Sequence, residues 1–147
     1  FSKAEQITVN SFADVSFSPE FLNNKLILIA DDNEENRLVA KEILLNYNNT
    51  INIMEAKDGN EVINLLFKNI PDILFIDLDM PNLNGIETTL LIKKNKKYSD
   101  LKIIGNTASL STFTDQELKE IGFDAFLQKP YHAKDLFNKI KLLTEMN

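Results

Sequence analysis

The chain has 147 residues, a length that suits one domain with a single buried core. It is 44% hydrophobic and 26% charged, which is ordinary for a globular protein, and its net charge of −6 argues against sequence-independent binding of nucleic acid. The absence of cysteine excludes disulfides, thiolate metal sites and cysteine nucleophiles.

The N-terminal segment, residues 1–24, is polar, rich in Ser and Asn, and has no clear hydrophobic period. We therefore predict a linker or N-terminal extension over residues 1–24 and a folded domain over residues 25–147. The first residue is Phe1 rather than Met, as expected of a fragment of a longer polypeptide.

From Lys25 onward, short apolar runs alternate with longer amphipathic stretches. The runs are Leu26–Ala30, Ile51–Ala56, Ile73–Asp77, Leu101–Thr107 and Ala125–Gln128. The first and third runs are continuously apolar, as expected of strands that are covered on both faces. All runs are far too short to span a bilayer, and no signal peptide is visible. We therefore expect no membrane contact by this chain. We also expect a cytoplasmic location for it, whether or not a parent protein is membrane-anchored.

The intervening stretches carry the signals of helices. Apolar residues recur at helical spacing at Ala40, Ile43, Leu44 and Tyr47, and again at Ala133, Leu136, Phe137 and Ile140. Asp58 with Glu61, and Thr114 with Glu117, form candidate capping boxes, and Gly122 stands where a glycine would end the fourth helix. Five βα units in sequence predict an α/β domain, a doubly wound five-stranded parallel sheet with five helices.

Polar residues end or directly follow four of the five runs, at the end of a parallel sheet where ligands bind. They are Asp31, Asp32, Asp77, Thr107 and Lys129. Three carboxylates close together repel one another unless a proton or a cation neutralises them, and all-oxygen ligation favours Mg²⁺. A carboxylate can also attack phosphorus to give an aspartyl phosphate, with an ammonium and a hydroxyl stabilising the phosphoryl oxygens.

Each of these residues has an ordinary structural explanation when taken alone. Asp31 and Asp32 could cap a helix, Thr107 could satisfy a strand-end backbone group, and Lys129 could be a solvated surface lysine. The functional interpretation depends on all of them falling at strand ends in one order.

Four motifs in this order resemble the receiver domains of two-component signalling. The stretch from Leu26 to Asn33 ends in Ala-Asp-Asp-Asn, and the third run continues as Asp77-Leu-Asp-Met-Pro-Asn-Leu-Asn-Gly85. Thr107-Ala108 and Lys129-Pro130 follow. The resemblance covers Lys25 to about Thr144 and implies the flavodoxin-like (βα)5 receiver fold.

The resemblance also implies a role for each site residue. Asp77 would be the phosphoacceptor, and Thr107 and Lys129 would hold the phosphoryl group. Asp32 would bind Mg²⁺ directly, Asp31 would act nearby or through water, and the backbone carbonyl of Asp79 would complete the protein ligands. Phe126 matches the family's aromatic switch position, which moves together with Thr107.

The family further implies its partners. A histidine kinase domain or a histidine-containing phosphotransfer protein would donate the phosphoryl group, and no nucleic acid would be bound by this chain. The stretch Asp31–Val39 is similar to receivers attached to hybrid sensor histidine kinases, with residues 1–24 as the linker from the kinase. The chain ends soon after the last predicted helix, so we expect no DNA-binding output domain in this fragment.

Two alternatives remain open at this point. The pair Asp77 and Asp79 resembles the Asp-x-Asp motif of haloacid-dehalogenase-like phosphatases, although Pro81 and an acidic pair upstream of the nucleophile fit that family poorly. A pseudo-receiver that binds partners without phosphorylation is the third possibility. Whether the domain acts as an enzyme, beyond its own phosphorylation and dephosphorylation, stays undecided.

Departures from the receiver pattern are Asn106 before Thr107, Phe126 where Tyr is common, and the extra carboxylate of Asp79.

Overall fold

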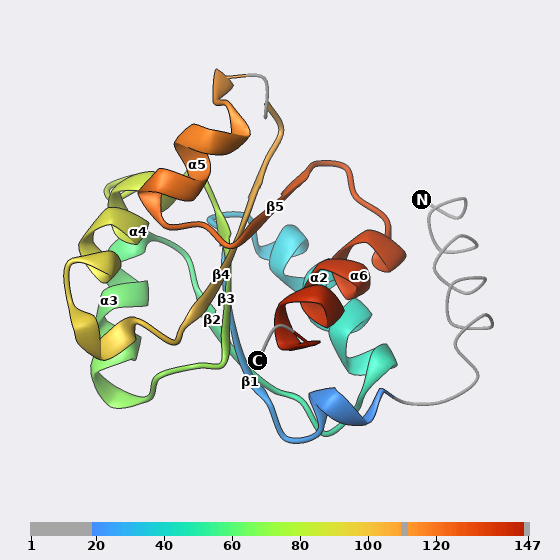
Figure 1. The fold of residues 1–147 in the computed structure, drawn as a ribbon. Helices are drawn as coiled ribbons and strands as arrows, with labels where there is room; N and C mark the ends of the chain where they lie inside the picture. Colours follow the sequence, from blue (N-terminus) through green and yellow to red (C-terminus); the bar gives the residue numbers. More distant parts are fainter. Residues whose placement is uncertain (1–18, 110–111, 146–147) are drawn as a thin grey trace.

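The computed structural model describes residues 19–109 and 112–145, which form a sheet with helices on both faces (Figure 1). The predicted linker lies mostly outside this part of the chain, since residues 1–18 are not described. The strands are β1 (Leu26–Ala30), β2 (Asn52–Ala56), β3 (Ile73–Asp77), β4 (Lys102–Thr107) and β5 (Ala125–Gln128). All neighbouring strands pair in parallel, in the order β2-β1-β3-β4-β5. The predicted doubly wound sheet is therefore confirmed.

Within the described residues, five α-helices connect and cover the strands. They are α2 (Glu34–Tyr47), α3 (Gly59–Lys68), α4 (Gly85–Lys93), α5 (Asp115–Ile121) and α6 (Ala133–Glu145), joined by the short 3-10 helices η1 (Glu20–Leu22) and η2 (Lys96–Tyr98). Helices α2 and α6 lie on one face of the sheet, and α3, α4 and α5 on the other (Figure 1). In this part of the chain no helix combines the length and the apolar character needed to cross a membrane.

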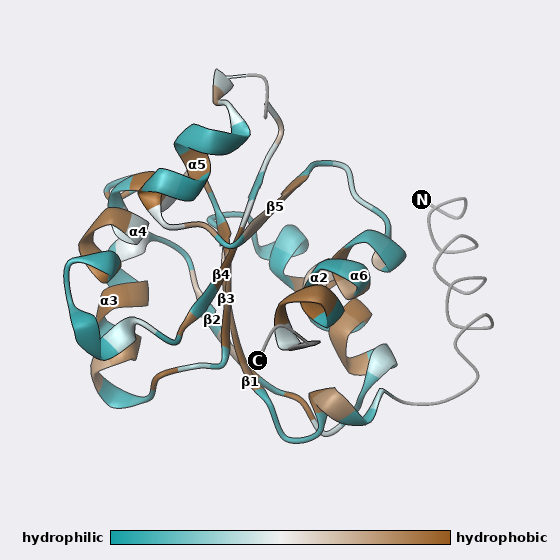
Figure 2. Cartoon of the chain, viewed as in Figure 1, coloured by the Kyte–Doolittle hydropathy of each residue, from teal (hydrophilic) through white to brown (hydrophobic). Residues whose placement is uncertain are grey.

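The sheet separates two buried hydrophobic clusters. Successive residues of the central strands face opposite sides, so Leu28 and Leu74 belong to the α3–α5 side while Ile29 and Phe75 belong to the α2–α6 side. Both sides are buried, which explains why β1 and β3 are continuously apolar in sequence. Each of these side chains contributes about 1.5–3 kcal/mol by burial. In Figure 2 the centre of the sheet is mostly brown, and the helices carry teal residues on their outer surfaces.

The pairing of β1 with β3 positions the candidate site. Ile27 pairs with Ile73 and Ala30 with Ile76, so the two strands end side by side. β2 lies on the other side of β1, which makes the β1–β3 boundary the point where the strand order reverses. Ligands of open parallel sheets bind at such a switch point.

The predicted helix caps are mostly present. Thr114 and Glu117 form a complete capping box, and Gly122 follows α5 with a φ of 128° that favours glycine. Asp58 accepts a hydrogen bond from the backbone N–H of Glu61, but the Glu61 carboxylate accepts from the N–H of Lys57 instead of that of Asp58. The first predicted box is thus only a single cap.

The segment just before β1 is fastened to the domain. Leu22, in η1, is 0% exposed and packs in the α2–α6 cluster. The amide of Asn48, at the end of α2, donates to the carbonyl of Pro19 at 2.9 Å and to Oδ1 of Asn23 at 2.7 Å.

Candidate functional site

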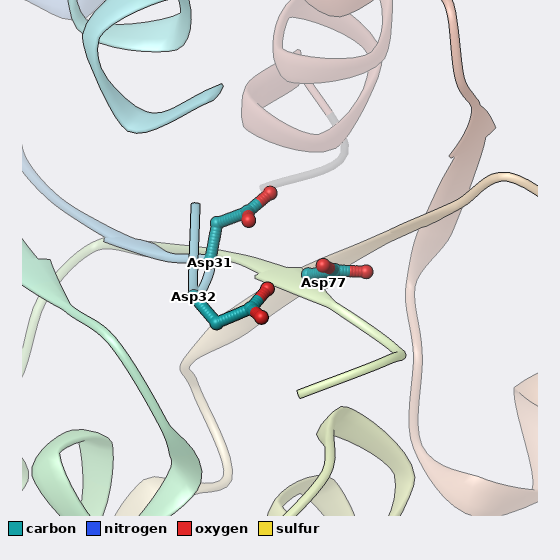
Figure 3. Close-up of side chains that lie close together, drawn as sticks. All are labelled: Asp31, Asp32 and Asp77. Atoms are coloured by element: carbon teal, nitrogen blue, oxygen red, sulfur yellow. The ribbon is translucent and has the colours of Figure 1, made fainter. Parts of the chain in front are cut away.

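Three carboxylates meet at the carboxyl ends of the two central strands. Asp31 and Asp32 directly follow β1, and Asp77 is the last residue of β3. Their side chains converge so that one oxygen from each lies within 4.8 Å of the others (Figure 3). Asp31 and Asp77 are each only 4% exposed, whereas Asp32 is exposed to solvent. The cluster therefore has two buried members and one that faces solvent.

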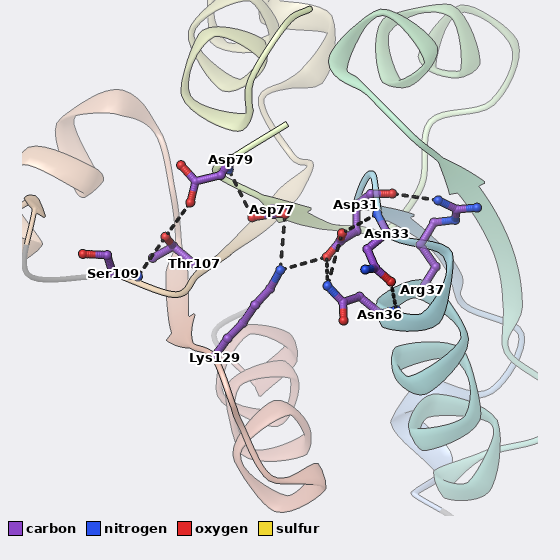
Figure 4. Close-up of polar contacts among 9 residues, drawn as sticks. All are labelled: Asp31, Asn33, Asn36, Arg37, Asp77, Asp79, Thr107, Ser109 and Lys129. Atoms are coloured by element: carbon purple, nitrogen blue, oxygen red, sulfur yellow. Dashed lines mark hydrogen bonds and ion pairs between the residues drawn. The ribbon is translucent and has the colours of Figure 1, made fainter. Parts of the chain in front are cut away.

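Lys129 reaches this cluster from the loop after β5. Its Nζ lies 3.0 Å from Oδ2 of Asp31 and 3.2 Å from Oδ2 of Asp77, so one ammonium bridges the two buried carboxylates (Figure 4). Its backbone N–H donates to the carbonyl of Thr107 at 2.8 Å. This bond ties Lys129 to the end of the neighbouring strand β4.

Asp31 is oriented by the start of α2. Its Oδ1 accepts from the backbone N–H of Asn33 at 2.9 Å, and its carboxylate accepts from the amide of Asn36 at 3.3 and 3.4 Å. Arg37 donates to the backbone carbonyl of Asp31 at 2.8 Å and pairs with Glu55 at 3.0 Å. The structure thus shows three supporting residues, Asn33, Asn36 and Arg37, whose part in the site we did not predict from the sequence.

Thr107 and Asp79 form a second group beside the carboxylates. The Thr107 hydroxyl donates to Oδ2 of Asp79 at 3.1 Å and accepts from the backbone N–H of Ser109 at 3.2 Å (Figure 4). The backbone N–H of Asp79 donates to Oδ1 of Asp77 at 3.1 Å. Asp79 is therefore the link between Asp77 and Thr107.

The electrostatics of the cluster show an incompletely compensated negative charge. Burial raises the pKa of Asp77, and the hydrogen bond from Asp79 and the charge of Lys129 oppose this effect only in part. Burial alone would lower the pKa of Lys129, but its hydrogen bond to Asp31 and the charge of Asp77 prevail and raise that pKa. Three carboxylates with one ammonium leave two negative charges unbalanced if all are ionised.

The sequence match decides the family. A model of the response regulator receiver domain matches residues 27–141, which is most of the chain. The chain belongs to the response regulator receiver domain family.

This receiver domain is similar to parts of longer proteins. It is 32% identical over 103 residues to stress response regulator protein 1 of Candida dubliniensis, covering 70% of this chain and 36% of that protein. It is 32% identical over 119 residues to the CAI-1 autoinducer sensor kinase/phosphatase CqsS of Vibrio cholerae, covering 80% of this chain and 17% of that protein. The chain thus spans about a third of the first relative and about a sixth of the second.

A solved structure has the same fold as this receiver domain. The receiver domain of the Francisella response regulator 1452 aligns with a TM-score of 0.69 and 29% sequence identity. The alignment covers 84% of this chain and 98% of that one. The predicted receiver fold is therefore confirmed by a comparison of structure as well as of sequence.

The donor set of the receiver domain fits a hard divalent cation. Asp31, Asp32 and Asp77 offer only oxygen atoms, and the unbalanced negative charge favours a cation of high charge density. The exposed position of Asp32 leaves room for water molecules, which Mg²⁺ retains in most protein sites.

Phe126 lies outside the carboxylate cluster. It is half-buried in β5, opposite Gly105 of β4, and packs against the cluster on the α3–α5 side. Of the residues predicted from the sequence, the structure brings Asp31, Asp32, Asp77 and Lys129 together. It places Asp79 and Thr107 beside them and Phe126 farther out on the sheet.

The loop after β3 is also anchored in a way that we did not predict from the sequence. Asn82, whose φ of 67° is left-handed, donates from its amide to Oδ2 of Asp58 at 3.1 Å. Leu83 accepts from the backbone N–H of Gly59 at 3.0 Å, so the loop is held against the start of α3. A complete capping box of Asn84 and Glu87 then begins α4. The Met-Pro pair at residues 80–81 and the Asn-Gly pair at residues 84–85 are typical of turns, so the sequence indicates a loop here but not its anchor to α3.

Proposed function

We propose that this receiver domain accepts a phosphoryl group on Asp77 in a Mg²⁺-dependent reaction and signals by a change of conformation. The observation that carries the proposal is the bridge from Lys129 to Asp31 and Asp77 within the cluster of three carboxylates. An ammonium in this position can stabilise an anion that forms on the Asp77 oxygens.

Asp77 is the proposed nucleophile. A lone pair of one Asp77 carboxylate oxygen would form the new O–P bond, while the P–N bond of a phosphohistidine donor breaks and its electrons return to the imidazole. The N–H of Asp79 and the ammonium of Lys129, each bonded to one oxygen of Asp77, hold that carboxylate in a fixed orientation before the reaction.

The metal ligands proposed are the carboxylates of Asp31, Asp32 and Asp77 and the backbone carbonyl of Asp79. Bound Mg²⁺ would supply neutralisation of the charge on the carboxylates and on the phosphoryl oxygens. Asp31 is already oriented for this role by Asn33 and Asn36, so little ordering of its side chain would be needed.

Lys129 and Thr107 would hold the phosphoryl oxygens after transfer, the first by charge and the second by its hydroxyl. A movement of Thr107 toward the phosphoryl group, with Phe126 as the aromatic partner of the switch, would shift the domain toward a second conformation. The helix α5, the strand β5 and the helix α6 would form the signalling surface, as the family resemblance implies.

The partners proposed are a histidine kinase domain or a histidine-containing phosphotransfer protein. The likeness to CqsS, whose name describes a sensor kinase/phosphatase, supports an origin in a hybrid sensor histidine kinase. We propose residues 25–147 as the receiver domain, residues 1–24 as its linker, and a cytoplasmic location, where a kinase has access to ATP.

The test is intact-protein mass spectrometry after incubation with acetyl phosphate and Mg²⁺. We expect the wild type to gain one phosphoryl group, and we expect no gain for Asp77→Asn or in the presence of a chelator. Asp100→Asn, which removes an exposed carboxylate, is the matched control and should gain the group as the wild type does. A folded wild type that stays unmodified by acetyl phosphate and by a phosphorylated histidine donor would refute the proposal and favour a pseudo-receiver.

A further inference from the structure

We propose that the Asp79 side chain restrains the Thr107 hydroxyl in the unphosphorylated protein, so that Thr107 must exchange Asp79 for the phosphoryl group during activation. Asp79 is then a positioning residue, separate from the metal ligation proposed for its backbone carbonyl. The inference rests on the proposed function, because it assigns a competitor to the hydroxyl that would bind the phosphoryl group.

The hydrogen bonds of Thr107 carry this inference. A hydroxyl has one proton to donate, and that proton is directed to Oδ2 of Asp79 at 3.1 Å. The Thr107 hydroxyl oxygen itself accepts from the backbone N–H of Ser109 at 3.2 Å. Thr107 is only 3% exposed, so bulk water is a poor substitute for either partner. A new acceptor can therefore obtain the proton only if Asp79 releases it.

Asp79 is held in place for this role by its own backbone. Its N–H donates to Oδ1 of Asp77 at 3.1 Å, so the residue bonds to Asp77 through the backbone and to Thr107 through the side chain. In Figure 4, the side chains of Asp79 and Thr107 point toward each other, and Asp77 is connected to the backbone of Asp79 and to Lys129. In this conformation the hydrogen bonds of the Thr107 hydroxyl thus go to Asp79 and Ser109, and Asp77 is bonded to Asp79 and Lys129.

The charge of Asp79 gives the restraint its strength. Hydrogen bonds to a carboxylate are stronger than those between neutral groups, but Asp79 is exposed to solvent, which weakens them. We expect the restraint to lower the apparent affinity for a phosphoryl group by about three- to tenfold.

The test is a double-mutant cycle of Asp79→Ala and Thr107→Val, measured with beryllofluoride as the phosphoryl mimic. The apparent dissociation constant is determined by calorimetry at saturating Mg²⁺, after the Mg²⁺ affinity of each variant has been measured. Asp79→Ala removes both the hydrogen-bond acceptor of Thr107 and a negative charge. The loss of the charge affects beryllofluoride binding equally in the wild type and in Thr107→Val, which has no hydroxyl to donate. The cycle therefore isolates the hydrogen bond to Thr107.

We expect Asp79→Ala to tighten beryllofluoride binding about three- to tenfold more in the wild-type background than in Thr107→Val. Asp79→Asn, which keeps an acceptor oxygen but loses the charge, should show a smaller coupling. Without the mimic, the methyl NMR signal of Thr107 should move in Asp79→Ala toward its position in the wild-type complex. Thermal unfolding checks that each variant is folded.

An equal gain in both backgrounds, with an unmoved Thr107 methyl signal, would overturn the restraint, because Asp79 would then act through charge alone. That result is distinguishable from a failure of the proposed function, in which the folded wild type would bind neither beryllofluoride nor a phosphoryl group.

Discussion

Lys129→Met is the substitution that most directly probes the carboxylate cluster. Methionine fills a similar volume but lacks the ammonium that lies 3.0 Å from Asp31 and 3.2 Å from Asp77. The two buried carboxylates would then face each other and Asp32 without a compensating charge. We expect the variant to fold but to be less stable than the wild type near neutral pH without Mg²⁺.

The magnitude follows from these distances and from burial. At an effective dielectric constant of about 20, each contact gives about 5 kcal/mol of gross attraction, most of which is offset by the desolvation of the charges. Removing one partner of a buried ion pair typically costs about 3–5 kcal/mol. The Lys129 side chain is 23% exposed, so we expect a value near the lower end, about 3 kcal/mol.

The pH dependence gives a second, independent check. The pKa of Lys129 is raised above its ordinary value of 10.5, so its contribution to stability is fully present below that pH and is lost only as the pH rises through the folded-state pKa. Toward low pH the contribution shrinks for a different reason, because Asp77, whose folded-state pKa is raised by burial, becomes protonated and no longer attracts the ammonium. The difference between wild type and variant should therefore be smaller at about pH 4 than at about pH 7.

The assay is urea denaturation followed by circular dichroism at low ionic strength without Mg²⁺. Lys134→Met is the matched control, since Lys134 is exposed and has no ion pair with any described residue. A loss for Lys129→Met that lies within about 0.5 kcal/mol of this control would refute the electrostatic reasoning. So would a loss that is the same at both pH values.

Two further predictions concern the β3 strand end. Asp77→Asn should raise the free energy of unfolding without Mg²⁺, because burial raises the folded-state pKa of Asp77 above its ordinary 3.8. A carboxyl group with a raised folded-state pKa destabilises the folded protein as the pH rises from about 3.8 through that pKa, whereas Asn does not titrate. In urea denaturation, the difference in free energy of unfolding between Asp77→Asn and the wild type should therefore grow over this pH window. A pH-independent difference would contradict this prediction. Gly85→Ala should cost about 1–3 kcal/mol in thermal unfolding, because the added Cβ would overlap the carbonyl oxygen of Asp77 and lie 2.8 Å from Cα of Leu78. Wild-type stability for that variant would show that the loop can shift.

The sheet and the cluster were predictable because their signals are local. Continuous apolar runs identify strands buried on both faces, and β1 and β3 are such strands. In a parallel sheet all strands end at one edge, so Asp31 and Asp77 are brought to the same edge by topology, whatever lies between them in sequence. The convergence of these residues also requires that β1 and β3 be neighbours, which the pairing of Ala30 with Ile76 shows.

The hydrogen bonds around the cluster were not predictable, because they depend on which side chains meet in three dimensions. Asn36 reaches Asp31 because α2 begins only a short loop after the end of β1, and Asn82 reaches Asp58 because the loop after β3 is held against the start of α3. The bond between Asp79 and Thr107 joins residues 28 apart in sequence. Polar residues of this kind have many possible partners, so residue type and spacing alone do not select one.

The fastening of the segment before β1 has a consequence for how a signalling complex can be arranged. The segment before β1 is held near the amino ends of the strands by the burial of Leu22 and by the hydrogen bonds from Asn48. Helix α6 ends near the same side of the sheet (Figure 1). Both ends of the described domain therefore lie on the side of the sheet opposite to Asp77. A protein that delivers or reads the proposed phosphoryl group can therefore approach the acidic edge from the side opposite to Pro19 and to the end of α6.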